Sequence, residues 1–453
     1  MNSMNYPVIL VNVSRKANQI QFPIGLSVIA NTLKKHGIDT SIIDLVPFDA
    51  NERENVFIDA VKREPAIYGF GVMIGNDHLN EVEKCAAIIR KVSPESVIVY
   101  GGHFPSSIPE LMLENCACDY LIHGEGERSF PELVKKIRSG ERSPEDVAGI
   151  FFMRGGKVIG TRNKRIGNLD ELSNPDFSLF DMDYYIRYLI ETGQSWEIMA
   201  SRGCYGNCSF CYKFMGQGIS LRRVDYVLDE IEYIIKNFNL KRFYFVDENF
   251  LQIKKYFMEF IEKKNERGLE FTFTAQSRID VIDEKTCEAG SKNGLTCIST
   301  GIESVSQKTL DYIDKKLTVE QAEEKIALMR KYNIRPMVNF IIGFPWDTEE
   351  DYEQLYQFIT RNNLQKLVRL SYLTPLPSTR LFQELVEKGV IKDIFVYSLK
   401  LDNLYWQRHI NLTGLKDDVL DYHFDRITKL SRRDLFDVKS SEYLRQMREE
   451  RFI

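Results

Sequence analysis

Short apolar segments that alternate with amphipathic stretches limit most strongly what this chain of 453 residues can fold into. A first series occupies residues 1–165, with predicted strands at Pro7–Asn12, Thr40–Leu45, Ile67–Ile74, Val97–Gly102 and Asp119–His123. The segment Leu26–His36 between the first two has apolar residues at helical spacing. Strands that alternate with helices predict an α/β domain with a doubly wound parallel sheet, whose ligands bind at the carboxyl ends of the strands.

A second alternating series starts near Trp196. Its predicted strands are Trp196–Ala200, Arg242–Val246, Glu270–Ala275, Leu295–Thr300, Met337–Ile342 and Leu367–Leu373. Such β/α units predict a six-stranded parallel sheet that forms a partial (β/α)6 barrel over 196–388, with chemistry at the C-terminal ends of its strands. The pair Gly155-Gly156 predicts a hairpin before it, 166–195 a linker, and 389–453 a small helical C-terminal region that includes the run Ser440–Arg451.

Composition narrows the function classes. The net charge of −5 disfavours a strongly basic nucleic-acid binder, and 8 cysteines are too few for a disulfide scaffold. There is no run of about 18 apolar residues, so we expect no membrane span. The N-terminus lacks the pattern of a secretory signal, so we expect a cytoplasmic protein with reduced cysteines.

Three of the cysteines form the cluster Cys204-x3-Cys208-x2-Cys211 directly after the first barrel strand. Gly206 and Asn207 favour a loop, which can wrap around one centre, whereas a helix would spread the thiols along roughly 10 Å. A structural zinc site needs four ligands, and no fourth Cys or His lies at the usual spacing. An iron–sulfur cluster with three thiolates would leave one iron open. The alternative is three unrelated buried cysteines.

This motif after the first strand of a six-unit partial barrel resembles the signature of the radical S-adenosylmethionine (SAM) superfamily. The resemblance implies a 4Fe-4S cluster held by Cys204, Cys208 and Cys211, whose open iron binds SAM, and a 5′-deoxyadenosyl radical formed by one-electron cleavage. It also implies an electron donor such as flavodoxin or ferredoxin. The aromatic residue before the last cysteine, Phe210, fits the same motif.

By the same resemblance, polar residues after the later barrel strands contact SAM. The implied set is Asp247, Glu248, Gln276, Ser277, Arg278, Glu303, Gly343 and Pro345. Acids at a strand end can instead cap the next helix, and Arg278 can instead form a surface ion pair. Trp346 departs from the usual Gly-x-Pro-Gly turn, which leaves the conformation of that loop open.

A parallel α/β domain before such a barrel resembles the subgroup of radical SAM enzymes that bind cobalamin. The implied cobalamin contacts are Asn12, Gly75, Gly101, Gly102, His103, Gly124, Glu125 and Gly126. The Asp-x-His-x-x-Gly motif is absent, which in this subgroup does not exclude binding. A lone histidine such as His78 or His103 is more often an ordinary hydrogen-bonded residue.

We therefore expect a radical SAM enzyme that uses cobalamin to methylate an unactivated carbon of a small-molecule biosynthetic intermediate. The first alternative is a 5′-deoxyadenosyl-radical dehydratase, cyclase or rearrangement enzyme that does not transfer a methyl group, with or without bound cobalamin. The second is an iron–sulfur or cobalamin carrier without catalysis. The substrate, any hydrogen-atom donor and the oligomeric state do not follow from the sequence, although the aromatics Tyr212, Phe214, Trp346 and Trp406 are candidates for the pocket wall or the core.

Overall fold

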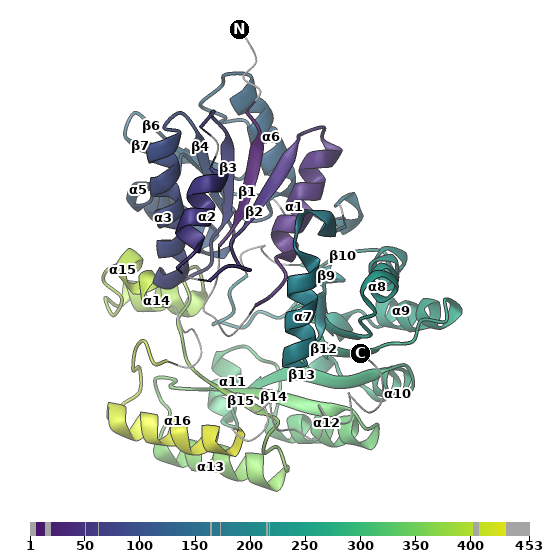
Figure 1. Ribbon diagram of the computed structural model, residues 1–453. Coiled ribbons are helices and arrows are strands. Elements are labelled where there is room, and N and C mark those ends of the chain that lie inside the picture. Colours follow the sequence, from purple (N-terminus) through teal and green to yellow (C-terminus); the bar gives the residue numbers. More distant parts are fainter. Residues whose placement is uncertain are drawn as a thin grey trace. The chain divides into compact units, whose positions relative to one another are not determined.

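The computed structural model describes residues 6–13, 20–49, 51–61, 63–163, 165–172, 174–213, 216, 218–401 and 407–431. The predicted helical run Ser440–Arg451 and the pocket candidates Phe214 and Trp406 lie outside these residues. The chain divides into two compact units (Figure 1). The first comprises Met1–Tyr188, Tyr212–Gly216 and Leu376–Asp402, and the second comprises Leu189–Cys211, Gln217–Pro375 and Asn403–Ile453.

The first unit is built on a seven-stranded sheet in the order β2-β1-β3-β4-β5-β6-β7. Its strands are β1 (Val8–Asn12), β2 (Thr40–Asp44), β3 (Ile67–Gly71), β4 (Val97–Gly101), β5 (Tyr120–Ile122), β6 (Ile150–Arg154) and β7 (Lys157–Gly160). The strands β1 to β5 run parallel, and β6 and β7 add an antiparallel hairpin at one edge. The structure thus confirms the predicted parallel sheet and the Gly155-Gly156 hairpin.

Alternate side chains of the central strand β1 enter two different apolar clusters. Val8 and Leu10 pack with residues of α1 and α6, whereas Ile9 and Val11 pack with residues of α2 and α3. This period of two is expected for a parallel strand that is covered on both faces. The helices of the unit are α1 (Ile24–Lys35), α2 (Arg53–Ala60), α3 (Asn76–Val92), α4 (His103–Ser107), α5 (Pro109–Asn115), α6 (Gly126–Arg138), α14 (Arg380–Glu387) and α15 (Ile394–Leu399).

The second unit contains a six-stranded, wholly parallel sheet in the order β15-β14-β13-β12-β11-β8. Its strands are β8 (Trp196–Ile198), β11 (Arg242–Phe245), β12 (Thr272–Gln276), β13 (Leu295–Glu303), β14 (Arg335–Ile342) and β15 (Val368–Tyr372), and the short pair β9 (Ser201–Arg202) and β10 (Ser220–Leu221) lies beside it. Its helices are α8 (Val224–Phe238), α9 (Lys254–Glu266), α10 (Glu284–Lys292), α11 (Gln307–Tyr312), α12 (Val319–Lys331), α13 (Glu349–Arg361) and α16 (Asp417–Ser431). All six predicted strands are present, each followed by a helix, as a partial barrel requires.

The two faces of this second sheet differ in character. In β11, Phe243 and Phe245 are buried, whereas Tyr244 between them is only partly buried. The strand β14 repeats the alternation over its whole length. One face therefore packs an apolar core against helices, and the other carries polar groups such as Tyr244 and Gln276, which hydrogen-bond each other at 3.0 Å.

Three features differ from the boundaries drawn from sequence. The helix α7 (Met182–Thr192, 11 residues) lies in the C-terminal part of the segment 166–195, which was predicted as a linker. The strand β13 continues to Glu303 through an irregularity in its pairing with β14, instead of ending at Thr300. The segment Leu376–Asp402 groups with the first unit, and α15 contributes Ile394, Phe395 and Leu399 to one of its apolar clusters. Among the described residues, no helix is long and apolar enough to cross a membrane.

Candidate functional site

The cysteine segment forms a loop, as the glycine and asparagine within it predict. Cys204 and Cys208 are partly buried and Cys211 is exposed. The Cys211 N–H donates to the Cys208 carbonyl (3.1 Å), and the Ser209 N–H donates to the carbonyl of Ile313 (3.2 Å). The second half of the loop is thereby fixed both within itself and to the segment that follows α11.

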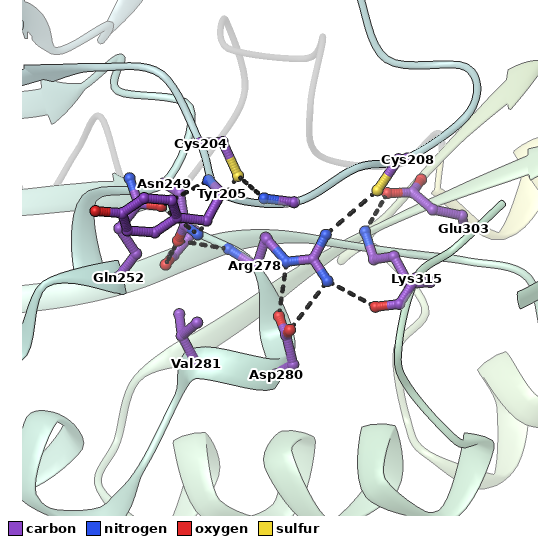
Figure 2. A network of polar contacts seen from close by, with 12 residues as sticks. Cys204, Tyr205, Cys208, Asn249, Gln252, Arg278, Asp280, Val281, Glu303 and Lys315 are labelled. Carbon is purple, nitrogen blue, oxygen red and sulfur yellow. Dashed lines mark hydrogen bonds and ion pairs between the residues drawn. The ribbon is translucent and has the colours of Figure 1, made fainter. Parts of the chain in front are cut away.

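Two of the thiols accept hydrogen bonds from side chains that lie far away in the sequence, and Cys204 also accepts one from within the loop (Figure 2). Cys204 Sγ accepts from Asn249 Nδ2 at 3.7 Å and from the Gly206 N–H at 3.3 Å. Cys208 Sγ accepts from Arg278 Nη1 at 3.3 Å. Donors that point at cysteine sulfur are the groups that orient metal-bound thiolates and adjust their electron density.

Asn249, which follows β11, connects the cysteine loop with the end of β12. Its side chain is buried, and its Oδ1 accepts from Ser277 Oγ (2.6 Å) and from the Arg278 N–H (3.1 Å). Gln252 clamps the loop on both sides of Cys204. Its Nε2 donates to the Gly203 carbonyl (3.0 Å), and its Oε1 accepts from the Tyr205 N–H (3.3 Å).

Arg278 makes the largest number of polar contacts in this network. Its guanidinium forms a bidentate pair with Asp280, at 2.9 Å for each of the two hydrogen bonds, and its Nη2 also donates to the Lys315 carbonyl at 2.6 Å. Burial alone would lower the pKa of Arg278, but its hydrogen bond with Asp280 and the charge of that carboxylate outweigh burial and raise the pKa. The guanidinium therefore carries its positive charge next to Cys208.

A buried ion pair lies beside this group. Lys315 Nζ is 2.8 Å from Glu303 Oε1, and the two side chains are only 5% and 11% exposed. Glu303 takes a left-handed backbone conformation (φ 74°), which a residue with a side chain rarely adopts. Its carboxylate occupies the space over Gly301, where an added Cβ would lie 1.8 Å from Oε1. The carboxylate that the resemblance assigns to SAM is thus paired with Lys315 in this structure.

Several other residues that the resemblance assigns to SAM lie at the ends of β11 and β12. Asp247 is 1% exposed, and its carboxylate accepts from the Ala200 N–H and from Ser201 Oγ. Burial raises the pKa of Asp247 to about 7. Glu248 is exposed and accepts from the N–H of Gly203, next to Cys204 (2.8 Å). Asp247 therefore supports the chain before the cysteine loop, and Glu248 supports the loop itself.

The turn after β14 takes its shape from a carboxylate. Asp347 accepts from the N–H groups of Gly343 and Phe344, both at 3.0 Å, and burial raises its pKa to about 6. Gly343 has positive φ (103°), whereas Trp346 is not among the described residues with positive φ. The indole of Trp346 donates to Thr309 Oγ1 on α11 at 2.8 Å. The tryptophan at this position therefore packs on α11, and Pro345 before it is exposed.

The remaining five cysteines have the character of buried structural residues. Burial raises the pKa of the thiols of Cys85 and Cys116 to about 12 and that of Cys287 to about 11. It also raises the pKa values of Cys118 and Cys297. Protonated thiols are poor metal ligands, so these five cysteines are poorly suited to hold a metal.

The cysteine loop carries the kind of donor set that an iron–sulfur cluster uses. Within the described part of the chain, no group of three His, Cys, Asp or Glu side chains could hold a metal ion. A 4Fe-4S cluster takes its thiolates on separate irons, so its ligands stand wider apart, and the N–H donors to Cys204 and Cys208 suit that kind of group. Three thiols, two of which accept hydrogen bonds from distant side chains, therefore fit the ligand set of an iron–sulfur cluster.

In the first unit, the predicted cobalamin contacts lie at the carboxyl ends of the strands. Asn12 ends β1, and its Nδ2 donates to Asp44 Oδ1 (2.9 Å) and to the hydroxyl of Tyr185 (3.2 Å). Tyr185 also donates to Asp44 Oδ2 at 2.8 Å. His103 accepts a hydrogen bond at its carbonyl from the hydroxyl of Tyr212 (2.6 Å). Glu125 is buried, and its carboxylate accepts from the Ile166 N–H.

The glycines in that set have internal reasons to be glycine. Gly75, Gly102 and Gly124 have positive φ (117°, 98° and 76°). A Cβ on Gly101 would meet the side chain of Ile122 at 3.6 Å, and one on Gly126 would meet Ile29 at 3.3 Å. Turn conformation and packing within the domain thus account for them without a ligand. His78 likewise accepts from the Met73 N–H at 3.2 Å, an ordinary hydrogen bond at a strand end.

Four residues of this network were not predicted from the sequence: Asn249, Gln252, Asp280 and Lys315. Asn249 follows a predicted barrel strand, and this position could have identified it as a site residue. Gln252 and Lys315 lie in segments with no motif, and only the folded chain brings them to the cysteine loop. Phe210 is partly buried in that loop.

Two family models match the chain. Residues 198–359 match the radical SAM superfamily and residues 11–134 match the B12 binding domain. An uncharacterized methyltransferase of Pyrococcus horikoshii is 29% identical over 82% of this chain and 79% of its own length. The anaerobic magnesium-protoporphyrin IX monomethyl ester cyclase of Rubrivivax gelatinosus is 29% identical over 83% of this chain and 68% of its own length.

The fold also resembles a solved structure. The radical SAM methyltransferase TsrM from Kitasatospora setae, with cobalamin and a 4Fe-4S cluster bound, superimposes with a TM-score of 0.71 at 19% identity and covers 85% of this chain and 76% of its own. The match to the B12 binding domain spans β2 to β5 of the first unit, and the match to the radical SAM superfamily spans β11 to β14 of the second. The chain is therefore a radical SAM enzyme that carries a B12-binding domain in front of its radical SAM domain.

Proposed function

We propose that this enzyme methylates an unactivated carbon of a small-molecule biosynthetic intermediate and uses cobalamin, SAM and a 4Fe-4S cluster. The observation that carries the proposal is the pairing of a B12-binding domain with a radical SAM domain in one chain. Several relatives with this resemblance are methyltransferases by name, among them the hopanoid C-3 methylase of Methylococcus capsulatus, 24% identical over 79% of this chain and 67% of its own.

In this proposal, Cys204, Cys208 and Cys211 hold the cluster, and the ends of β11, β12 and β13 support the bound SAM. When bound, the cluster would supply the electron that cleaves SAM, and cobalamin would carry the methyl group. The residues Asn249, Gln252 and Arg278 hold the cysteine loop in place from three sides. The assignment of SAM contacts to Asp247, Gln276, Ser277, Gly343 and Pro345 remains a prediction.

Cobalamin would lie at the carboxyl ends of β1, β3, β4 and β5, the edge where ligands of parallel sheets bind. Asn12, His103 and Glu125 are the predicted polar contacts at that edge. A flavodoxin or ferredoxin would supply the electron. A cytoplasmic location likewise stays a prediction.

The test combines a cofactor measurement with a product measurement. The protein is purified without oxygen, reconstituted with iron and sulfide, and incubated with cobalamin, after which its visible spectrum and iron content are recorded. We expect about four irons per chain, the number in a 4Fe-4S cluster, and the absorption bands of bound cobalamin. Cys208→Ala should lose the cluster, whereas the matched control Cys116→Ala, in which another partly buried thiol is removed, should keep it.

The SAM-derived products then separate methylation from other radical chemistry. Methyl transfer releases S-adenosylhomocysteine as well as 5′-deoxyadenosine, and a reaction that yields only 5′-deoxyadenosine would reject it. A cyclase is the second candidate. The cyclase of Rubrivivax gelatinosus is 29% identical to this chain, the same value as for the uncharacterized methyltransferase of Pyrococcus horikoshii. A protein that binds neither iron nor cobalamin would reject both candidates.

A further inference from the structure

The cysteine loop has a positively charged neighbour that is fixed from several directions. Arg278 Nη1 lies 3.3 Å from Cys208 Sγ, and the same guanidinium is held by Asp280 and by the Lys315 carbonyl (Figure 2). Its side chain is only 11% exposed. By resemblance, this arginine would meet the carboxylate of SAM, but in the structure it already forms its bidentate pair with Asp280.

We propose that Arg278 is a positioning residue for the iron–sulfur cluster: its guanidinium holds the Cys208 sulfur by a hydrogen bond and makes the cluster easier to reduce. This inference rests on the proposed assignment of Cys204, Cys208 and Cys211 as cluster ligands. It adds to that assignment a group that sets the cluster's reduction potential and its retention by the protein.

The electrostatic reason is direct. A reduced cluster carries one more negative charge than an oxidised one, so a nearby fixed cation stabilises the reduced state more. Net charge, hydrogen bonds to the sulfurs and solvent exposure are the quantities that set the potentials of iron–sulfur clusters. Arg278 supplies the first two together, because it is positively charged and donates to Cys208 Sγ.

The guanidinium is also held in one orientation. Asp280 fixes Nε and Nη2, the carbonyl of Lys315 accepts from Nη2, and Nη1 is thereby directed at the sulfur. The main chain of the loop comes close on the other side. A Cβ on Gly206 would lie 2.5 Å from Arg278 Nη1 and 3.2 Å from its Cζ. Gly206 therefore leaves the space that the guanidinium fills next to the cysteine loop.

The first experiment removes the charge. Arg278→Gln is compared with wild type and with Arg361→Gln, in which an exposed arginine of the same unit loses its surface pair with Glu323. The reduction potential of the reconstituted cluster is measured by electron paramagnetic resonance without SAM. We expect the ratio of reduced to oxidised cluster at a fixed potential to fall about tenfold, equivalent to a shift of about 59 mV for a one-electron couple. Arg361→Gln should match wild type.

The second readout does not depend on redox state. Groups that orient metal ligands typically contribute about 10- to 100-fold to metal affinity. We therefore expect Arg278→Gln to lose its iron at roughly one tenth of the chelator concentration that wild type tolerates. Arg278→Lys keeps the charge but loses the bidentate pair with Asp280, and it should recover part of the potential but little of the retention.

A third variant displaces the guanidinium without changing its charge. In Gly206→Ala the new Cβ would lie 2.5 Å from Nη1, too close for the guanidinium to stay in place, whereas Gly414→Ala, the control, adds a Cβ with nothing within 4 Å. We expect Gly206→Ala to shift the potential in the direction of Arg278→Gln, and Gly414→Ala to leave it unchanged.

The outcomes separate this inference from the proposed function. A wild-type protein without a cluster would reject the ligand assignment itself. An Arg278→Gln protein with a normal cluster, a normal potential and normal iron retention would overturn the inference alone. If that variant lost only affinity for SAM, Arg278 would be a cofactor contact instead, and the positioning role would be wrong.

Discussion

The buried ion pair between Lys315 and Glu303 leads to a prediction about stability that needs no cofactor. The two charged groups lie 2.8 Å apart, and both side chains are almost fully buried. The variant Lys315→Met keeps the length of the side chain but removes its charge. It leaves the backbone carbonyl of residue 315, which accepts from Arg278, in place.

The expected magnitude follows from the geometry. At 2.8 Å and an effective dielectric constant of about 20, the two charges attract each other by about 6 kcal/mol. Loss of hydration offsets much of this attraction in the intact pair. Removal of one partner leaves the other charge buried and unpaired, which typically costs about 3–5 kcal/mol. We expect Lys315→Met to lower the free energy of unfolding by an amount in that range.

The assay is urea unfolding of the cluster-free protein, followed by circular dichroism. Lys316→Met is the matched control, since the neighbouring lysine is 78% exposed and pairs with Asp314 on the surface. Surface pairs contribute roughly 0–1 kcal/mol, so this control should stay close to wild type. The double variant Lys315→Met/Glu303→Gln should be more stable than Lys315→Met, because no buried charge then remains. Equal effects of the two lysine variants, or strictly additive effects in the double variant, would refute the reasoning.

Three further predictions test other elements. Burial raises the pKa of Asp247 to about 7. The folded protein therefore keeps a proton that the unfolded chain releases near pH 3.9. The free energy of unfolding should fall by at most about 4 kcal/mol as the pH rises from about 4 to about 7. Asp247→Asn should flatten this dependence, and an unchanged pH profile would contradict it. Gly102→Ala forces a Cβ to 3.0 Å from the Val72 carbonyl at φ 98° and should cost about 1–3 kcal/mol in urea unfolding, whereas Gly167→Ala, with open space around it, should not. Asn249→Ala removes the donor to Cys204, and amide hydrogen exchange in residues 203–206 should become faster; equal rates would show that Asn249 does not hold the loop.

The alternation of strands and helices was predictable because it depends on local patterns of apolar residues. A strand such as Val97–Gly101 is buried on both faces and therefore reads as a continuous β-branched run. The helix α7 was missed since Met182–Thr192 follows a segment with acids and a proline, and only Tyr185 is buried in it. Tyr185 donates a hydrogen bond to Asp44, which lies 141 residues away in the sequence, and no local pattern encodes such a contact.

The candidate site was predictable only in part, for a related reason. The spacing of Cys204, Cys208 and Cys211 carries information because, in the proposed function, all three must reach one cluster. The groups that donate to their sulfurs come from separate strand ends, and their spacing in the sequence is set by the lengths of helices rather than by the site. Arg278 was found by its place after β12, but its partners were not, because Asp280 and Lys315 act on it through the fold.

Two glycines show how such a distant contact can nevertheless leave a trace in the sequence. Neither Gly206 nor Gly301 has positive φ, so backbone conformation does not demand glycine there. In each case the space of the missing Cβ holds the charged end of another side chain: the guanidinium of Arg278 at Gly206 and the carboxylate of Glu303 at Gly301. Both charged groups would have to move if a side chain were present, and both lie next to Lys315. A glycine without positive φ near the cysteine loop therefore marks where a buried charged group is placed. A Gly301→Ala variant should disturb the ion pair of Glu303 and Lys315, just as Gly206→Ala should displace the guanidinium of Arg278.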